Sequence, residues 1–250
     1  MKASRVNNSR FTHPTNSFFR FFLSLISVFL LLFVFSACRK EVSYSDYVSE
    51  LRSNIFLAEA DGFFLRIYAV EKENPYVTDG IPQETSARTE VYLTASEGLE
   101  SCNVSFSVNG KEYGGEMSFD NVKTQYYYSC TLDVSELTEL SCRIEYGKTQ
   151  LEMNALSVRT EKTLSPEAVL KTLQTEDTEL FTSLTDKYGF AGEIYIRLIY
   201  EDSPYYYIGV IDRAGNINAF LLNAETGKII ARRQSGSSSI SFSRRQQKVG

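Results

Sequence analysis

Short apolar runs alternate with polar positions along residues 54–158, and this period of two predicts β-strands rather than helices. The runs 55–60 and 63–70 meet at Asp61-Gly62, and a third run leads into Asn109-Gly110. Both dipeptides favour the tight turn of a β-hairpin, because their residues tolerate positive φ angles. About seven or eight strands at this spacing are typical of a β-sandwich. The remaining strands are expected at residues 88–95, 126–134, 141–146 and 150–157.

A helical period begins after Thr163. Ser165-Pro166-Glu167 supplies a capping hydroxyl, a proline and an acid at the positions where a helix N-terminus favours them. Residues 175–177 interrupt the pattern, and Gly189 ends it. We therefore expect a helix in two segments, with one apolar face formed by Val169, Leu170, Leu173, Leu180, Phe181, Leu184 and Tyr188.

Three strands are expected after the helix, at residues 193–200, 205–212 and 217–223, the last continuing through a turn to 228–230. A helix packed on a three-stranded antiparallel meander is a small α+β unit. The predicted fold class is therefore mainly β, with a β-sandwich followed by this unit. The predicted organisation is a signal peptide 1–37, a linker 38–53, the sandwich 54–158, the α+β domain 164–232 and a disordered basic tail 233–250.

The N-terminus has the pattern of a secretory signal. An acid-free basic segment, residues 1–20, precedes an apolar run that closes with Phe35-Ser36-Ala37-Cys38. Small residues directly before a cysteine are typical of bacterial lipoproteins, so we expect cleavage before Cys38 and lipid attachment to its thiol. An uncleaved signal anchor is the alternative, although a spanning helix needs roughly 20 apolar residues. Either alternative predicts that residues 39–250 lie on the extracytoplasmic face of the cell membrane.

The distribution of charge along the chain limits the classes of partner that the protein can bind. The chain has 26 Lys+Arg against 31 Asp+Glu and a net charge of −5, yet it holds no acid after Lys228. The acidic body excludes nucleic acid as a partner. The basic tail could contact anionic lipid or a cell-wall polymer, or it could be a solvated terminus, which the serine-rich run 235–239 favours.

Two stretches resemble known families. A strand, the short turn 133–137 and a returning strand 140–146 are similar to the immunoglobulin-like modules of bacterial surface proteins, without a Cys-Trp-Cys core because the chain has no Trp. The run 205–210, the turn Arg213-Ala214-Gly215 and the stretch 219–230 resemble the end of a PepSY domain. Such modules more often hold, space or bind than catalyse.

The PepSY resemblance covers residues 164–232, because the helix opening 164–168 is also similar to the first element of that family. Asn223 stands where the family usually has Asp, but Asn also accepts turn conformations and bonds its own backbone. PepSY domains occur in secreted peptidase propeptides and surface lipoproteins. The resemblance thus implies a unit that regulates a peptidase or binds a partner, and no catalytic residues.

Composition also argues against an enzyme. The only histidine is His13, inside the predicted signal peptide. The mature chain therefore lacks the base of Ser-His-Asp and Cys-His catalysis and any histidine-containing zinc site. Cys102, Cys130 and Cys142 lack Cys-x-x-Cys spacing, so we expect no metal and no cofactor. Cys130 and Cys142 could form a disulfide that leaves Cys102 free, or all three could be reduced and buried.

Tyrosine triplets at residues 126–128 and 205–207 are candidate contact sites. The outer two tyrosines of a triplet share one face of a strand and the middle one points to the other face. We expect Tyr205 and Tyr207 to contact a partner, or Tyr206 if the other two pack on the helix. The predicted function is a non-catalytic, lipid-anchored binding or regulatory protein that engages a peptidase or an envelope protein. The alternative is a structural lipoprotein of an envelope complex with no peptidase role.

Overall fold

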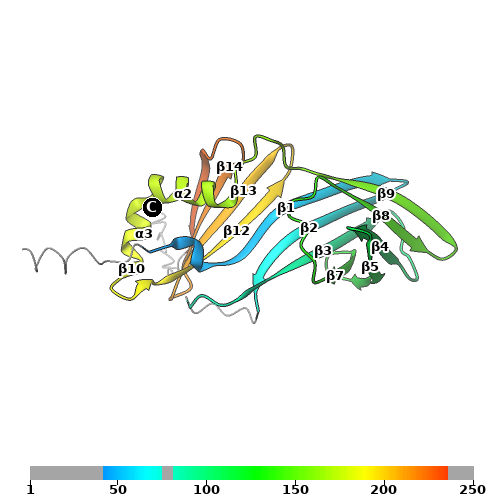
Figure 1. Ribbon diagram of the computed structural model, residues 1–250, viewed down its shortest axis with the longest axis horizontal. Helices are drawn as coiled ribbons and strands as arrows, with labels where there is room; N and C mark the ends of the chain where they lie inside the picture. Colours follow the sequence, from blue (N-terminus) through cyan, green and yellow to red (C-terminus); the bar gives the residue numbers. More distant parts are fainter. Residues whose placement is uncertain (1–41, 75–80, 236–250) are drawn as a thin grey trace, which may run out of the picture. The chain divides into compact units, whose positions relative to one another are not determined.

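The computed structural model describes residues 42–74 and 81–235. The expected signal peptide 1–37, Cys38 and residues 236–250 of the expected tail lie outside this part of the chain. The described chain is mainly β, as the sequence predicts, and most of its strands belong to one large sheet (Figure 1). The strand order along that sheet is β15-β14-β13-β12-β1-β2-β3-β7-β6.

The described part of the first half, residues 42–74 and 81–157, contains a short 3₁₀ helix and nine strands. Both predicted hairpin turns are present, with positive φ angles at Asp61 (49°), Gly62 (79°), Asn109 (51°) and Gly110 (77°). β4, β8 and β9 join the large sheet through pairing of β9 with β1, and β5 pairs with β4. The elements are η1 Tyr44–Tyr47, β1 Val48–Ala60, β2 Phe63–Glu73, β3 Thr85–Ala95, β4 Asn103–Val108, β5 Lys111–Glu116, β6 Ser118–Asp120, β7 Gln125–Cys130, β8 Glu139–Tyr146 and β9 Thr149–Ser157.

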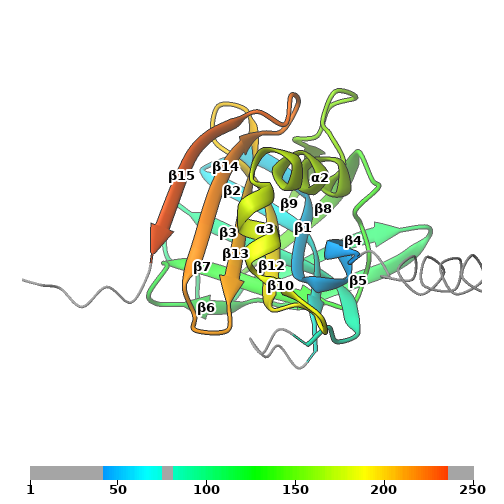
Figure 2. The ribbon, with the colours of Figure 1, turned by 90° about the vertical axis from the view of Figure 1, so that its left-hand side faces the viewer.

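The second half begins with the predicted helix. Ser165 Oγ accepts a hydrogen bond from the Ala168 N–H at 3.2 Å, and Pro166 occupies the first turn. Figure 2 shows both helices lying across one face of the C-terminal strands. The elements are α2 Pro166–Glu176, α3 Thr178–Ser183, β10 Thr185–Asp186, β11 Gly189–Phe190, β12 Gly192–Tyr200, β13 Pro204–Asp212, β14 Ile217–Asn223 and β15 Ile229–Ser235.

Two details of this half differ from the sequence prediction. The second helical segment ends at Ser183, and a β10–β11 hairpin follows in which Tyr188 is 81% exposed instead of continuing the apolar face. The Asp186 carboxylate accepts the Tyr188 N–H at 2.7 Å, which stabilises a turn in place of another helical turn. The meander has four strands instead of three, because β15 extends to Ser235 and pairs with β14.

The main unexpected feature is the parallel pairing of β1 with β12. Residues 48–52 of β1 pair with residues 194–197 of β12, while β1 pairs with β2 from Glu50 to Ala60 and with β9 at two positions. Residues 48–53, which the sequence assigns to a linker, are therefore part of a strand. Through β1, the strands predicted for the β-sandwich and those predicted for the α+β unit form one continuous sheet.

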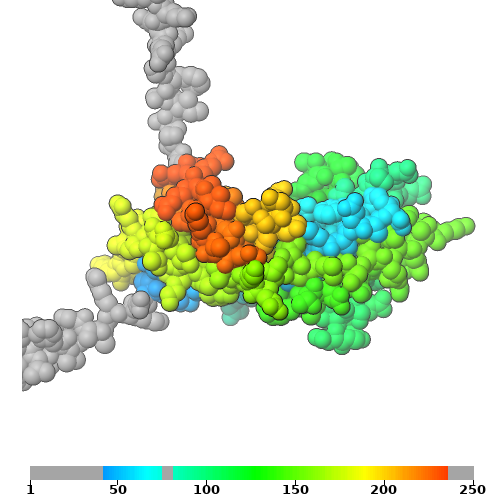
Figure 3. Space-filling view, turned by 90° about the horizontal axis from the view of Figure 1, so that it is seen from above, coloured from blue at the N-terminus to red at the C-terminus, as the bar shows by residue number. Residues whose placement is uncertain are grey.

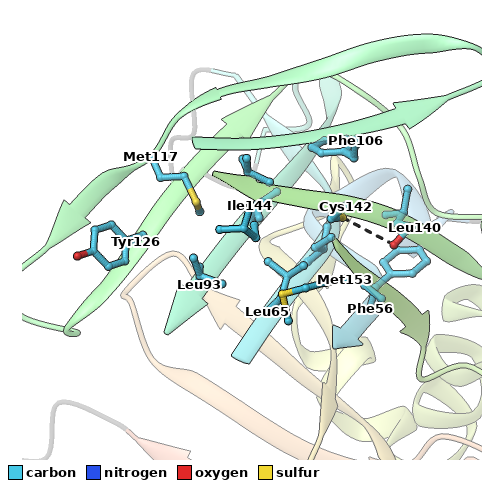
Figure 4. Close-up of a cluster of buried hydrophobic side chains, with 14 of the residues drawn as sticks. Phe56, Leu65, Leu93, Phe106, Met117, Tyr126, Leu140, Cys142, Ile144 and Met153 are labelled. Atoms are coloured by element: carbon cyan, nitrogen blue, oxygen red, sulfur yellow. Dashed lines mark hydrogen bonds between the residues drawn. The ribbon is translucent and has the colours of Figure 1, made fainter. Parts of the chain in front are cut away.

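Most of the core lies on one side of β1, β2 and β3 (Figure 4). Side chains from these three strands meet side chains from β4, β8 and β9, among them Phe56, Leu65, Leu93, Phe106, Leu140, Ile144 and Met153. A second apolar layer lies under α2, where Val169, Leu170 and Leu173 are at most 1% exposed. Both layers cover the same side of the long strands, while the other side carries polar and aromatic residues together with some apolar ones.

Candidate functional site

The face of β1, β2, β3 and β7 that points away from the core carries aromatic and basic side chains. Cross-strand pairing places Arg66 opposite Tyr92, and Tyr92 opposite Tyr127. Because alternate residues of a strand share a face, Tyr68 lies on the same side as Arg66. We call this set the tyrosine–arginine surface: Arg52, Arg66, Tyr68, Tyr92 and Tyr127.

These five side chains form a row across four strands. The Arg52 guanidinium carbon lies 3.9 Å from the centroid of the Tyr68 ring, within the range of a cation–π contact. Ring centroids are 5.3 Å apart between Tyr68 and Tyr92 and 5.0 Å apart between Tyr92 and Tyr127. Arg66 Nη1 donates a hydrogen bond to Tyr68 Oη at 3.2 Å. Tyr68 is thereby held by both arginines.

Burial and neighbouring charges shift the pKa values of two residues of the row, Tyr92 and Arg52. Burial raises the pKa of Tyr92, and the nearby Glu90, whose Oε2 accepts from Tyr92 Oη at 2.9 Å, raises it further. Burial also lowers the pKa of the Arg52 guanidinium from its ordinary value. Arg52 Nε is buried and has no hydrogen-bond partner in the described part of the chain. A buried donor without a partner is rare in proteins, so this N–H sets Arg52 apart from the other residues of the row.

A pocket of about 420 Å³ opens at one end of the row. It lies where β12 separates from β1, and Figure 3 shows the segment that ends β12 beside the β1–β2 hairpin. Two arginines, one carboxylate and several apolar or aromatic side chains line it: Arg52, Ile55, Leu57, Phe64, Arg66, Tyr68, Ile199, Tyr200 and Glu201.

A charged cluster lies next to the row on the same face. Glu50 accepts two hydrogen bonds from Arg197, at 2.7 and 2.9 Å, and Lys72 Nζ lies 3.4 Å from its Oε2. Burial by itself would raise the pKa of Glu50, but the hydrogen bonds and positive charge of Arg197, together with Lys72, hold it below its ordinary value. Glu50 is therefore a structural carboxylate, fully used in joining β1, β2 and β12.

The structure separates the three tyrosines predicted as partner contacts. Tyr206 is 0% exposed, and its hydroxyl donates to the Leu164 carbonyl at 2.9 Å on the helix side of the sheet. Tyr205 and Tyr207 are half-buried on the opposite side, where the Tyr207 ring stacks with Tyr195 at 5.8 Å. Of the two alternatives, the structure therefore has Tyr205 and Tyr207 outward, and Tyr206 is not accessible to a partner.

All three cysteines of the described chain are free thiols. Of the two alternatives for the cysteines, the structure has no Cys130–Cys142 bridge: β7 pairs with β3 and β6, whereas β8 pairs with β4 and β9. Cys102 and Cys142 belong to the core, and Cys130 packs against it. Burial raises the pKa of Cys102 to about 11 and, aided by Glu152, that of Cys142 to about 12. Such thiols are poor nucleophiles.

Asn223 closes the β14–β15 turn as the sequence suggests. Its Oδ1 accepts hydrogen bonds from the backbone N–H groups of Glu225 and Thr226, at 3.0 and 2.9 Å, and from the Thr226 hydroxyl at 3.0 Å. Gly227 follows with φ of 70°, a conformation that glycine accepts most easily. The Asn223 side chain is thus engaged in the turn.

Within residues 42–74 and 81–235, no group of His, Cys, Asp and Glu side chains is arranged to hold a metal ion. No helix of this part of the chain is long and apolar enough to cross a bilayer. No protein-family model, curated protein or solved structure matches the chain.

The tyrosine–arginine surface was not predicted from the sequence. A signal existed, because the alternation along residues 63–70 places Phe64, Arg66 and Tyr68 on one face of a strand whose other face is apolar. The partners Tyr92 and Tyr127 could not be joined to them without the order of the strands.

Proposed function

We propose that this protein is a non-catalytic, lipid-anchored extracytoplasmic binding protein and that the tyrosine–arginine surface holds its protein partner. One observation carries the proposal: three consecutive tyrosine rings and two arginines form a row on the side of the sheet opposite α2. Tyrosine and arginine are the residues that most often dominate the energy of protein interfaces, since they bury large areas and still make polar contacts.

The sequence resemblance to PepSY domains supports the class of partner. In this proposal β1–β9 correspond to an immunoglobulin-like sandwich, and the helices with β12–β15 correspond to a PepSY-like unit. The Ser165 cap, the Asn223 turn and the strand sequence after the helices agree with the PepSY pattern. A peptidase is therefore the first partner to test, because the family's implied role is to regulate peptidases.

Partner capture with matched variants tests the surface. The tagged full chain is purified from detergent-solubilised membranes of the source cell, and bound proteins are quantified by mass spectrometry. Tyr127→Ser removes the last ring of the row, and Tyr188→Ser removes an exposed tyrosine from the β10–β11 hairpin as a control. We expect specific loss of one or more partners with the first variant only. Equal capture by both variants and the wild type would refute this placement.

Two further measurements test the remaining parts of the proposal. A captured peptidase should lose activity when the pure protein is added, and hydrolysis of a peptide by the pure protein alone would overturn the non-catalytic assignment. Lipidation predicts that globomycin causes precursor to accumulate. Normal processing and anchoring of a Cys38→Ala chain would count against the lipid anchor.

A further inference from the structure

The pocket at the end of the tyrosine–arginine surface has two positive groups and an unsatisfied donor. Arg52 and Arg66 both line it, and the buried Nε of Arg52 has no hydrogen-bond partner in the described chain. The Nε atom is itself buried, so it is the charge of the two guanidinium groups that favours an anion in the pocket.

Tyr68 fixes the positions of the two guanidinium groups. Its ring lies 3.9 Å from the Arg52 guanidinium carbon, and its hydroxyl accepts from Arg66 Nη1 at 3.2 Å. Arg66 also lies 5.2 Å from the centroid of the Phe64 ring. A guanidinium group held in this way loses little side-chain entropy on binding, and its planar fork matches the two oxygens of a carboxylate.

The remaining lining residues define what accompanies the anion. Ile55, Leu57 and Ile199 give the pocket an apolar part, and Phe64 and Tyr200 add aromatic rings. A pocket of about 420 Å³ is within the usual size of small-ligand sites, so it can take one large apolar side chain beside the anion. A purely inorganic anion would leave that apolar surface unused.

Glu201 limits the charge of the ligand. Glu201 lines the same pocket as Arg52 and Arg66, so the charged lining residues sum to a single net positive charge. A monoanion matches this balance, whereas a phosphate dianion would add repulsion from Glu201. The row Tyr68, Tyr92 and Tyr127 continues from the pocket across the sheet and offers aromatic surface to a longer chain.

We propose that this pocket binds the C-terminus of a polypeptide, with the terminal carboxylate on Arg52 and Arg66 and an apolar or aromatic last side chain against Ile55, Phe64 and Ile199. The inference rests on the proposed function, since it says which part of a protein partner the surface recognises. The preceding residues of that partner lie along the tyrosine row.

A peptide-binding measurement tests it directly. The probe is a fluorescein-labelled hexapeptide that ends in phenylalanine with a free carboxylate, and the matched probe has a C-terminal amide. Fluorescence anisotropy with the full chain should show binding of the free acid that is at least about tenfold tighter than binding of the amide, as expected from the loss of one charge-assisted contact. Inorganic phosphate should not compete at the concentrations at which N-acetylphenylalanine does.

Matched arginine variants locate the site. Arg66→Gln removes an exposed guanidinium of the pocket, and Arg88→Gln makes the same change at an exposed position of β3 on the same face, outside the pocket. We expect about tenfold weaker binding for the first and a change within about twofold for the second. Arg52→Lys keeps the charge but removes the planar guanidinium group and should also weaken binding, with thermal melting as the check on folding.

The outcomes separate this inference from the function on which it rests. Equal affinity for acid and amide, equal effects of Arg66→Gln and Arg88→Gln, or displacement by phosphate would each overturn the C-terminal site. If Tyr127→Ser loses partner capture but the free-acid probe does not bind, the binding surface stands and the carboxylate site is wrong. If the probe binds as expected but Tyr127→Ser captures every partner, the site stands and the proposed partner surface is wrong.

Discussion

The two faces of the C-terminal strands differ in burial although both carry apolar residues. Leu222 is 0% exposed on the side that the helices cover, while its neighbour Leu221 is half-buried on the other side. Tyr206 and Tyr207 show the same contrast. The covered face stabilises the fold, because its side chains are removed from water. The open face of the same sheet holds the rings and charges that are available for recognition.

Truncating the two leucines should give the largest difference between the faces. Leu222→Ala removes a fully buried side chain and should lower the free energy of unfolding by about 2–5 kcal/mol. Leu221→Ala should cost no more than about 1 kcal/mol, because its side chain stays partly in water when folded. Urea unfolding of both variants measures the two costs. Equal costs would mean that the helices do not bury the face on which Leu222 lies.

Glu50→Gln tests the charged cluster on the open face. The change should cost about 1–3 kcal/mol at neutral pH, because Arg197 and Lys72 lose their carboxylate partner. The folded pKa of Glu50 lies below its ordinary value of 4.5, so this stabilisation is complete above that pH and is lost as the pH falls through the folded value. The gap between variant and wild type should therefore close in acid. Glu59→Gln, at an exposed position of the same strand, should show no such gap.

Removing the hydroxyl of Tyr206 or of Tyr207 should have a smaller effect on the free energy of unfolding. Tyr206→Phe loses the hydrogen bond to the Leu164 carbonyl and should cost about 1 kcal/mol, whereas Tyr207→Phe should change stability by less than about 0.5 kcal/mol. Burial raises the pKa of Tyr206 to about 12. Its hydroxyl should therefore stay protonated when exposed tyrosines ionise, as ultraviolet titration can show. Ionisation of all tyrosines near pH 10 would contradict the burial of Tyr206.

Thiol labelling compares the two buried cysteines of the core with Cys130, which packs against the core, and needs no substitution. Cys130 is half-buried, whereas Cys102 and Cys142 are buried and have their pKa raised to about 11 and 12. N-ethylmaleimide should modify Cys130 first, and the other two should react only on unfolding. Mass spectrometry of timed samples gives the order. A protein that resists labelling at Cys130 and Cys142 until a reductant is added would contain the disulfide that the structure lacks.

Local patterns in the sequence predicted most of the elements. Asp61-Gly62, Asn109-Gly110 and the Ser165 cap are local signals, since each acts on residues that lie next to it in the chain. Tyr188 was misplaced because a local hydrogen bond to Asp186 outweighs its fit to the helical period. All of these features are turns or helix caps, and the residues next to them in the chain determine their conformation.

Long-range pairing could not be predicted in the same way. Residues 48–53 have no strand signal strong enough to separate them from a linker, and their partner strand β12 follows much later in the chain. The tyrosine–arginine surface depends on the same kind of information, because Tyr68, Tyr92 and Tyr127 come together only through strand order. The candidate site was missed for this reason, although its residue types were visible.

The parallel pairing of β1 with β12 has a consequence for the order of folding. Glu50 and Arg197 are 147 residues apart, so one edge of β1 stays without its partner until nearly all of the chain has been synthesised. Contacts of such sequence separation slow folding, because the loop must be closed before the contact stabilises it. β1 can meanwhile form its hairpin with β2, while the edge of residues 48–52 that pairs with β12 stays open. The pairing of β1 with β12 is therefore a late step in folding, which cannot occur before residues 194–197 have been synthesised.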